Sequence, residues 1–280
     1  MTELTLGYSP CPNDTFIFYS LVHGLIETGD FSFVERLEDV ETLNRLALQG
    51  ELDITKISYH LLGFIRRDYC LLRAGGALGR GCGPLVVSRR FDSMAELKGK
   101  RIAVPGRYTT ACLLLRLFDP ELDDIVFLPF HEIMGAVASG KADAGVIIHE
   151  SRFTFEEYGL KKLLDLGDWW EGETGHPIPL GGIVAKRSLG RATVAALDRM
   201  LRASVAHALA HPGAANVYIR AHSQEMSDEV CAAHINLYVN SFSLDLGDEG
   251  EAAVIDLLAR AEAAGLVPRC DEGLFLSVGS

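Results

Sequence analysis

The fold is decided by a stretch that occurs twice, as GELDITKIS at residues 50–58 and as GKADAGVIIHE at residues 140–150. In each copy a glycine closes a helix-like stretch, an aspartate follows three residues later, and a short apolar run comes next. The first run leads into Lys56 and Ser58, and the second leads into His149. We therefore predict two similar lobes that face one cleft, the first supplying binding groups and the second a titratable base.

Apolar runs and helical periodicity alternate along most of the chain. Short apolar runs bounded by turn residues predict strands at 4–9, 53–58, 83–90, 101–106, 142–149 and 181–188. Helical spacing predicts helices at 13–26, 41–50, 58–66, 109–118, 131–140, 191–212, 227–240 and 248–268. The alternation predicts an α/β fold in which each lobe is a mostly parallel sheet flanked by helices, with the ligand cleft between the lobes.

A second pair of similar stretches marks where the chain passes between the lobes. Residues 83–89 read GPLVVSR and residues 181–187 read GGIVAKR, with an arginine at the same offset in each. We interpret them as paired crossover strands, one at the exit from lobe one and the other at the return. Lobe one is accordingly expected at 1–88 plus 189–280, and lobe two at 89–188.

Composition and charge exclude several classes of protein. The chain has 280 residues, 48% hydrophobic and 23% charged, as in soluble globular proteins with a substantial core. A net charge of −12 and the lack of basic runs disfavour nucleic acid and anionic membranes as partners. The sequence shows no secretory signal, no apolar window long enough to span a membrane, and no C-x-x-C pair among its six cysteines. We therefore expect a cytoplasmic protein with reduced thiols.

Each lobe contains a strand, a Gly/Pro loop and a helix that begins with threonine. These segments are YSPCPNDTF (8–16) and PGRYTTA (105–111). A helix N-terminus presents unpaired N–H groups and a partial positive charge, which suit a carboxylate or a phosphate. Simple capping also explains such residues. Because the motif occurs in matching places, we expect a small anionic ligand there, with added donors from Thr15, Thr109 and Thr110.

The ends of the two repeated strands carry the strongest candidates. Lys56 and Ser58 lie on the same side of their strand, because side chains alternate with a period of two. A lysine among apolar neighbours either extends to solvent or meets an anion, and we favour the anion. His149 follows an apolar run at the carboxyl end of a strand, where α/β enzymes keep their chemistry. Its imidazole suits proton removal near neutral pH, although a buried structural histidine is the competing interpretation.

The sequence contains no pattern typical of a metal or cofactor site. It lacks the spacings of zinc ligands, of phosphate-binding and dinucleotide-binding loops, and of a nucleophile elbow. His207 and His211 have i,i+4 spacing but no third ligand. We therefore expect no metal and no cofactor. Of the remaining histidines, His23, His222 and His234 are expected at the surface, while His60 and His131 stay open near the cleft.

Two further features allow more than one interpretation. Cys11 is a candidate nucleophile, since a helix start favours the thiolate, but no basic residue is adjacent to it. The segment HPIPLGG (176–182) follows Trp169 and Trp170, and it either lines an apolar ring site or forms an ordered connector.

Taken together, these residues resemble one known family. The stretches that carry the resemblance are SPCPNDTFIF (9–18), KISYH (56–60), TTA (109–111), IHESRFTF (148–155) and PIPLGG (177–182). They are similar to 1,4-dihydroxy-6-naphthoate synthase of the futalosine route of menaquinone biosynthesis. SPCPNDTF and the IHE segment are the specific parts, whereas the Gly–Asp frames are shared by the wider two-lobed, type II periplasmic-binding-protein-like fold.

The resemblance implies a cofactor-free carbon–carbon lyase. Its substrate would be cyclic dehypoxanthinylfutalosine, a carboxylated ring system joined to a sugar-derived ring. Its products would be 1,4-dihydroxy-6-naphthoate and dihydroxyacetone. The positions that match the family are His149 as proton acceptor and Lys56, Ile57, Ser58, Thr110 and Ala111 in the ligand-binding stretches; the first helix start adds Asn13, Asp14 and Thr15 as binding candidates.

Three other functions remain open on the sequence. The chorismate dehydratase of the same pathway shares the fold, but we do not match the SPCPNDTF opening to it. A solute-binding protein for a small carboxylate would need export, and the chain shows Met1 with no signal segment. A ligand-sensing regulatory domain would usually carry a basic DNA-binding helix pair, and none precedes lobe one. The oligomeric state is not indicated.

Overall fold

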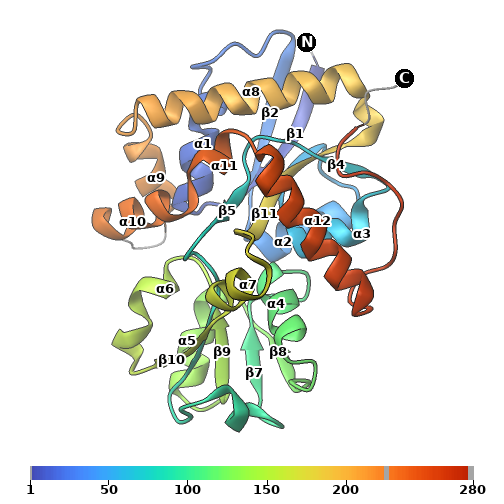
Figure 1. Ribbon diagram of the computed structural model, residues 1–280. Helices are drawn as coiled ribbons and strands as arrows, with labels where there is room; N and C mark the ends of the chain where they lie inside the picture. The colour runs from blue at the N-terminus through green and yellow to red at the C-terminus, as the bar shows by residue number, and fades with distance from the viewer. Residues whose placement is uncertain (1, 224–226, 277–280) are drawn as a thin grey trace.

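The computed structural model describes residues 2–223 and 227–276 and contains two sheets, each flanked by helices (Figure 1). The first sheet has the strand order β2-β1-β3-β11-β4, with β5 paired to β11, and the second has the order β10-β6-β9-β7-β8. The first contains β1 (Thr2–Tyr8), β2 (Phe31–Leu37), β3 (Ile54–Ser58), β4 (Tyr69–Leu71), β5 (Ala77–Gly79) and β11 (Ile178–Lys186). The second contains β6 (Leu85–Ser88), β7 (Ile102–Val104), β8 (Ile125–Phe127), β9 (Ala144–Ile147) and β10 (Lys161–Asp165). The predicted α/β class is confirmed.

Helices connect the strands, and the described chain begins and ends on the side of the first sheet (Figure 1). Around the first sheet lie α1 (Pro12–Val22), α2 (Val40–Leu48), α3 (Tyr59–Ile65), α8 (Arg191–Ala210), α9 (Asn216–His222), α10 (Asp228–Tyr238), α11 (Ser241–Leu244) and α12 (Gly247–Ala263). Around the second lie α4 (Thr110–Phe118), α5 (Phe130–Ala138), α6 (Ser151–Thr154) and α7 (Leu166–Thr174). Every helix predicted from the sequence is present, whereas α6, α7, α9 and α11 were not predicted.

Strand pairing corrects two expectations. The pairs β1–β2, β1–β3, β7–β8 and β7–β9 are parallel, but every pair made by β6 or β11 is antiparallel, so both sheets are mixed rather than mostly parallel. Each crossover strand also lies in the sheet opposite to the one expected, since β6 belongs to the second sheet and β11 to the first. The chain therefore passes between the sheets before each crossover strand, not after residues 88 and 188. A short apolar run fits either sheet, so its sequence does not choose between them.

The duplicated Gly–Asp frame has the same structure in both copies. The glycines that follow α2 and α5 have φ values of 71° and 77°, a left-handed conformation that glycine adopts without strain. Asp53 then accepts the backbone N–H of Thr5 at 3.0 Å, and Asp143 accepts that of Arg101 at 3.0 Å. Each carboxylate thereby ties a central strand, β3 or β9, to its parallel neighbour β1 or β7.

One apolar core extends across both sheets. It includes Ile57 and Val184 from the first sheet, Val86 and Val146 from the second, and Leu113 of α4. This shared core holds the two sheets against each other.

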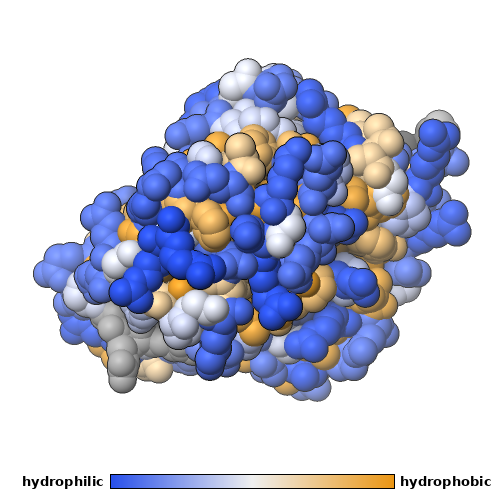
Figure 2. Space-filling model, turned by 90° about the horizontal axis from the view of Figure 1, so that it is seen from below, coloured by the Kyte–Doolittle hydropathy of each residue, from blue (hydrophilic) through white to orange (hydrophobic). Residues whose placement is uncertain are grey.

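Seen from the end of the second sheet, the surface is mainly hydrophilic, with hydrophobic residues in small groups (Figure 2). Within residues 2–223 and 227–276, no helix combines the length and the apolar character of a membrane span.

Candidate active site

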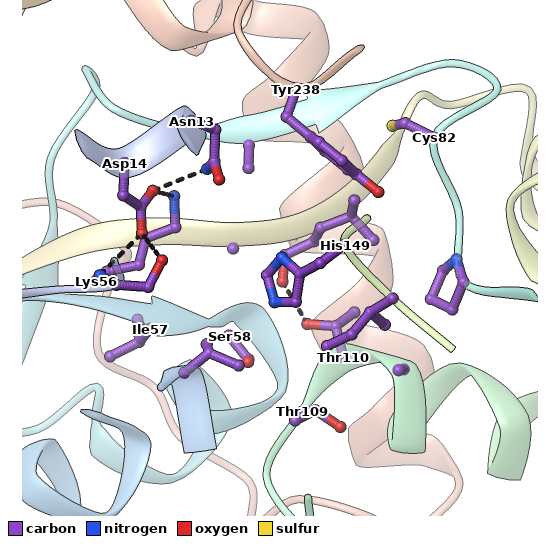
Figure 3. Close-up of a pocket in the computed structure, with 18 residues that line it drawn as sticks. Asn13, Asp14, Lys56, Ile57, Ser58, Cys82, Thr109, Thr110, His149 and Tyr238 are labelled. Carbon is purple, nitrogen blue, oxygen red and sulfur yellow. Dashed lines mark hydrogen bonds and ion pairs between the residues drawn. The ribbon is translucent and has the colours of Figure 1, made fainter. Parts of the chain in front are cut away.

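A cavity lies between the two sheets, and residues from both sides line it. Its wall contains the predicted residues Asn13, Asp14, Lys56, Ile57, Ser58, Thr110, Ala111 and His149. In the close-up, the His149 ring lies between the Lys56–Asp14 pair and Thr110 (Figure 3). Thr15 lies outside this wall, because its hydroxyl donates to the backbone carbonyl of Cys11 at 3.0 Å. Apart from Thr15, the candidates predicted from separate parts of the sequence come together.

Lys56 forms a buried ion pair with Asp14 in the cavity wall. Lys56 Nζ lies 2.9 Å from Asp14 Oδ1, and the two side chains are 7% and 2% exposed. Asp14 also accepts hydrogen bonds from the Ser9 hydroxyl and from the Asn13 amide, each at 2.8 Å. A carboxylate only accepts, whereas an ammonium has three donors. Asp14 therefore holds Lys56 in place, and Lys56 is the member of the pair suited to an anionic ligand.

Ser58, at the end of β3, is held by Asn44 of α2. The backbone N–H of Ser58 donates to Asn44 Oδ1 at 2.9 Å, and Asn44 Nδ2 donates to Ser58 Oγ at 3.1 Å. Asn44 is fully buried. Because the Ser58 oxygen already accepts a hydrogen bond, its hydroxyl proton is oriented for donation to a ligand. The sequence did not single out Asn44, since on the inner face of α2 it stands beside the core residue Leu43.

The start of α4 forms another part of the wall through Thr110 and Ala111. Thr109 caps the helix by accepting the N–H of Cys112 at 3.2 Å, and Thr110 donates its hydroxyl to the carbonyl of Leu180 at 2.6 Å. Both hydroxyls are thus used within the protein rather than as the added ligand donors we expected. The first N–H groups of a helix have no acceptor within it, so the positive end of α4 faces the cavity.

Glu41 of α2 joins the first-sheet side of the wall to the loop before α4. Its carboxylate accepts the backbone N–H groups of Arg107 at 2.9 Å and Tyr108 at 3.1 Å. A Cβ at Gly106 would lie 2.5 Å from the Glu41 carboxyl carbon, so this close approach requires glycine. Burial raises the pKa of Glu41, and hydrogen bonds from Asn44 and these N–H groups offset part of that effect. The contact fixes the start of α4 relative to β3.

His149 turns sharply out of β9 into the cavity. Its φ of 56° lies in the left-handed region, and it is the only non-glycine residue with positive φ in the described chain. An L-residue in this conformation costs about 1–2 kcal/mol, a strain that is common at functional positions. Burial lowers the pKa of His149, while the charges of Glu150 and Asp14 raise it in part. The imidazole is therefore neutral near pH 7 and able to accept a proton.

His234, which the sequence placed at the surface, is fully buried beside His149. The two rings are nearly parallel, at 14°, with centroids 5.9 Å apart. His234 Nε2 lies 2.9 Å from Asn13 Oδ1, and Nδ1 is buried without a hydrogen-bond partner among the described residues. The sequence spacing did indicate this burial, because Cys231, His234 and Tyr238 have the spacing of one helix face, and all three are buried in α10. The expectation of a surface histidine was wrong.

A second cavity touches His149 from another side and is lined by Cys11 and Glu150. The ligand atoms of these three side chains lie within 4.8 Å of one another, so they are close enough to hold a metal ion. Burial raises the pKa of the Cys11 thiol, and a protonated thiol is a poor metal ligand and a poor nucleophile. One carboxylate oxygen of Glu150 is buried without a partner in the part of the chain that the structure describes.

Three other candidates have structural contacts outside the main cavity. His60 Nδ1 lies 3.2 Å from the carbonyl of Thr109, and burial lowers the pKa of His60 to about 4. Trp170 is buried and donates its indole N–H to the carbonyl of Pro177 at 3.2 Å, so it orders the segment 176–182, while Leu180 and Gly181 of that segment line the cavity. His207 pairs with a serine of α1 at 2.8 Å rather than with a set of metal ligands.

The fold defines a two-lobed α/β protein of the periplasmic-binding-protein-like class, with a cavity between the sheets. The aliphatic sulphonate-binding protein SsuA of Escherichia coli shares this architecture, with a TM-score of 0.65 and 15% identity over 95% of this chain and 89% of its own. The alkanesulfonate-binding protein SsuA of Xanthomonas axonopodis has a TM-score of 0.69 and 16% identity over 96% and 95%. At such identity the likeness concerns the fold alone.

Within this class, the chain belongs to the 1,4-dihydroxy-6-naphthoate synthase family and is an enzyme of menaquinone biosynthesis. The family model described as menaquinone biosynthesis matches residues 4–263. Synthases of this name from Thermus thermophilus and Streptomyces coelicolor are 54% and 50% identical to it; the matches cover 99% and 95% of this chain and 100% and 95% of theirs. The solved protein AF1704 of Archaeoglobus fulgidus is 38% identical, with a TM-score of 0.87 over 95% of this chain and 98% of its own. The resemblance of the sequence motifs is confirmed.

Proposed function

We propose that the protein is a cofactor-independent carbon–carbon lyase that converts cyclic dehypoxanthinylfutalosine to 1,4-dihydroxy-6-naphthoate and dihydroxyacetone. The observation that carries the proposal is the placement of His149, a neutral imidazole turned into a cavity that also contains Lys56 and the start of α4. The names of the two relatives at 54% and 50% identity support the product. The motif resemblance supports the substrate.

The proposed reaction needs a base and a place for negative charge. Cleavage of a carbon–carbon bond next to a carbonyl, with gain of aromaticity, requires removal of a proton, and negative charge develops on oxygen as the bond breaks. We assign the proton removal to His149. Lys56, the Ser58 hydroxyl and the N–H groups at the start of α4 are donors for that charge. Asp14 and Asn44 fix two of these donors in advance, so they need little reorganisation during the reaction.

The base is tested by His149→Ala in steady-state kinetics with cyclic dehypoxanthinylfutalosine. We expect kcat to fall by about 10²–10⁴-fold while the ligand still binds, because the change removes a proton acceptor rather than a holding group. Lys56→Ala and Ser58→Ala are expected to weaken ligand binding as well as to lower kcat, because both side chains are proposed donors to the ligand. His207→Ala, which removes a histidine outside the cavity, is the control and should turn over normally. Normal turnover by His149→Ala would contradict the assignment.

The substrate is tested by parallel incubations of the wild-type enzyme. Naphthoate should form from cyclic dehypoxanthinylfutalosine, and chorismate should be left unchanged. Consumption of chorismate would support the dehydratase. Tight binding of either compound without any turnover would support a solute-binding protein instead.

A further inference from the structure

His234 is a buried titratable group that the reaction above does not use. It lies on α10, is fully buried, and stacks nearly parallel to His149. Nδ1 of His234 is buried without a hydrogen-bond partner within the described residues, an arrangement that calls for an explanation. The only other ring packed against His149 among the described residues is Phe130, which meets it edge-on at 5.2 Å between centroids. His234 therefore forms one of the two aromatic walls of the proposed base.

A chain of hydrogen bonds fixes which nitrogen of His234 carries the proton. Lys56 Nζ and Asn13 Nδ2 both donate to Asp14 Oδ1, at 2.9 and 2.8 Å. Because the Asn13 amide points its NH2 group at a carboxylate, its oxygen must be the atom that faces His234. That oxygen only accepts, so His234 Nε2, 2.9 Å away, is the donor. His234 is thus locked as the Nε2–H tautomer by the same residues that hold Lys56.

The charges around the two rings decide which one can take a proton. The titratable groups that act on His149 are Cys11, Asp14, Asp39, Lys56, Glu150 and His234. His234 is faced by two groups that repel a second positive charge, His149 and Lys56. Burial first, and then these two groups, hold the pKa of His234 well below its ordinary value. We therefore expect a proton taken up by the pair to go to His149, where the charges of Glu150 and Asp14 favour it.

We propose that His234 is a positioning residue for His149, a neutral ring with a locked tautomer that keeps the plane of the base fixed and water away from it. The Lys56–Asp14–Asn13–His234 chain then links the ligand-holding end of β3 to the base at the end of β9. This inference rests on the proposed role of His149, and it adds a residue that lies behind the cavity wall, in contact with the wall residues His149 and Asn13.

Two substitutions separate the ring from its hydrogen bond. His234→Gln keeps a donor near Asn13 but removes the ring, so water reaches His149. We expect kcat to fall by up to about 10²-fold with KM unchanged, because the base loses its alignment. The acid limb of kcat/KM should move to higher pH, since renewed hydration returns the pKa of His149 toward its ordinary value. His234→Phe keeps the ring and should leave the acid limb in place.

A control and a second readout make the outcome decisive. His207→Gln is the matched control, since His207 also pairs with α1 and stacks on another histidine, His211, but lies outside the cavity. Nitrogen-15 NMR of the histidine rings in the ligand-free enzyme should show His234 as a neutral Nε2–H tautomer throughout the titration of His149. The His149 signals are assigned by their loss in His149→Ala.

The outcomes distinguish the two proposals. If His149→Ala turns over normally while His234→Gln still shifts the His149 titration, the proposed base is wrong and the link between the rings stands. If His149→Ala is inactive while His234→Gln leaves both the acid limb and the His149 titration unchanged, the positioning role is wrong. A protonated His234 in the wild-type enzyme near neutral pH would overturn it without any variant.

Discussion

The central strands β3 and β9 share a frame and differ at their ends. Both follow a left-handed glycine and carry an aspartate that ties them to a parallel neighbour. At the end of β3, Lys56 and Ser58 are held by Asp14 and Asn44. At the end of β9, the backbone turns left-handed at His149, whose ring has no hydrogen bond from the described residues. The same frame, used twice, thus gives one strand end whose polar side chains are held in place and another whose imidazole has no hydrogen bond from the described residues.

The frame extends to the crossover strands. Lys186, at the end of β11, pairs with Asp53 at 3.1 Å, and Arg90, just after β6, pairs with Asp143. Each central strand therefore has a parallel neighbour, an antiparallel crossover strand, and an aspartate bound to both. The difference between the lobes is confined to the residues beyond this frame. Changes in the frame and changes at the strand ends should consequently have separable effects.

The largest expected difference is between the two lysines of the first sheet. Lys56→Met leaves Asp14 buried without its ion partner, which should lower the free energy of unfolding by about 3–5 kcal/mol. Lys186→Met breaks a pair whose side chains are 25% and 24% exposed, and should cost about 0–1 kcal/mol. Urea unfolding of the ligand-free variants measures both. Adding Asp14→Asn to Lys56→Met should restore part of the loss, and equal costs for the two lysines would contradict the comparison.

The strand ends were predictable because ligands bind beyond the carboxyl ends of strands in α/β sheets. Lys56 and His149 are far apart in sequence and belong to different sheets, yet each lies at the carboxyl end of an apolar run and both line the cavity between the sheets. Thr15 is a residue for which this prediction was wrong. It follows the same loop as Asn13, but the helix turns its hydroxyl back to the carbonyl of Cys11 instead of into the cavity.

What the sequence did not predict depends on contacts between distant segments. The strands β6 and β11 have interchangeable apolar cores, so only packing assigns each of them to its sheet. His234 lies on a helix face that a period of 3.6 identifies as buried, but nothing local indicates that His149 is its neighbour. Asn44 binds Ser58 across the turn between α2 and β3, a contact that exists only once both elements have formed.

The second difference between the ends is their response to pH. Burial holds the pKa of His149 below its ordinary value of about 6.5, so the acid limb of kcat/KM should lie below that pH. Protonation removes the base, and the rate should then fall about tenfold for each further pH unit. Turnover measured across the acid range checks this, with binding of the product as the control for the Lys56 end. A limb above the ordinary histidine pKa would contradict a buried base.

The smallest expected effect isolates the backbone at the two strand ends. His149 has φ of 56°, where glycine is relaxed and alanine is strained, so His149→Gly should be more stable than His149→Ala by about 1 kcal/mol. Ser58 has φ of −77° and ψ of 143°, so the same pair of substitutions there should have the opposite sign, because glycine loses more entropy on folding. Urea unfolding of the four variants measures both signs. The same sign at both positions would mean that the left-handed turn at His149 is not intrinsic to the end of β9.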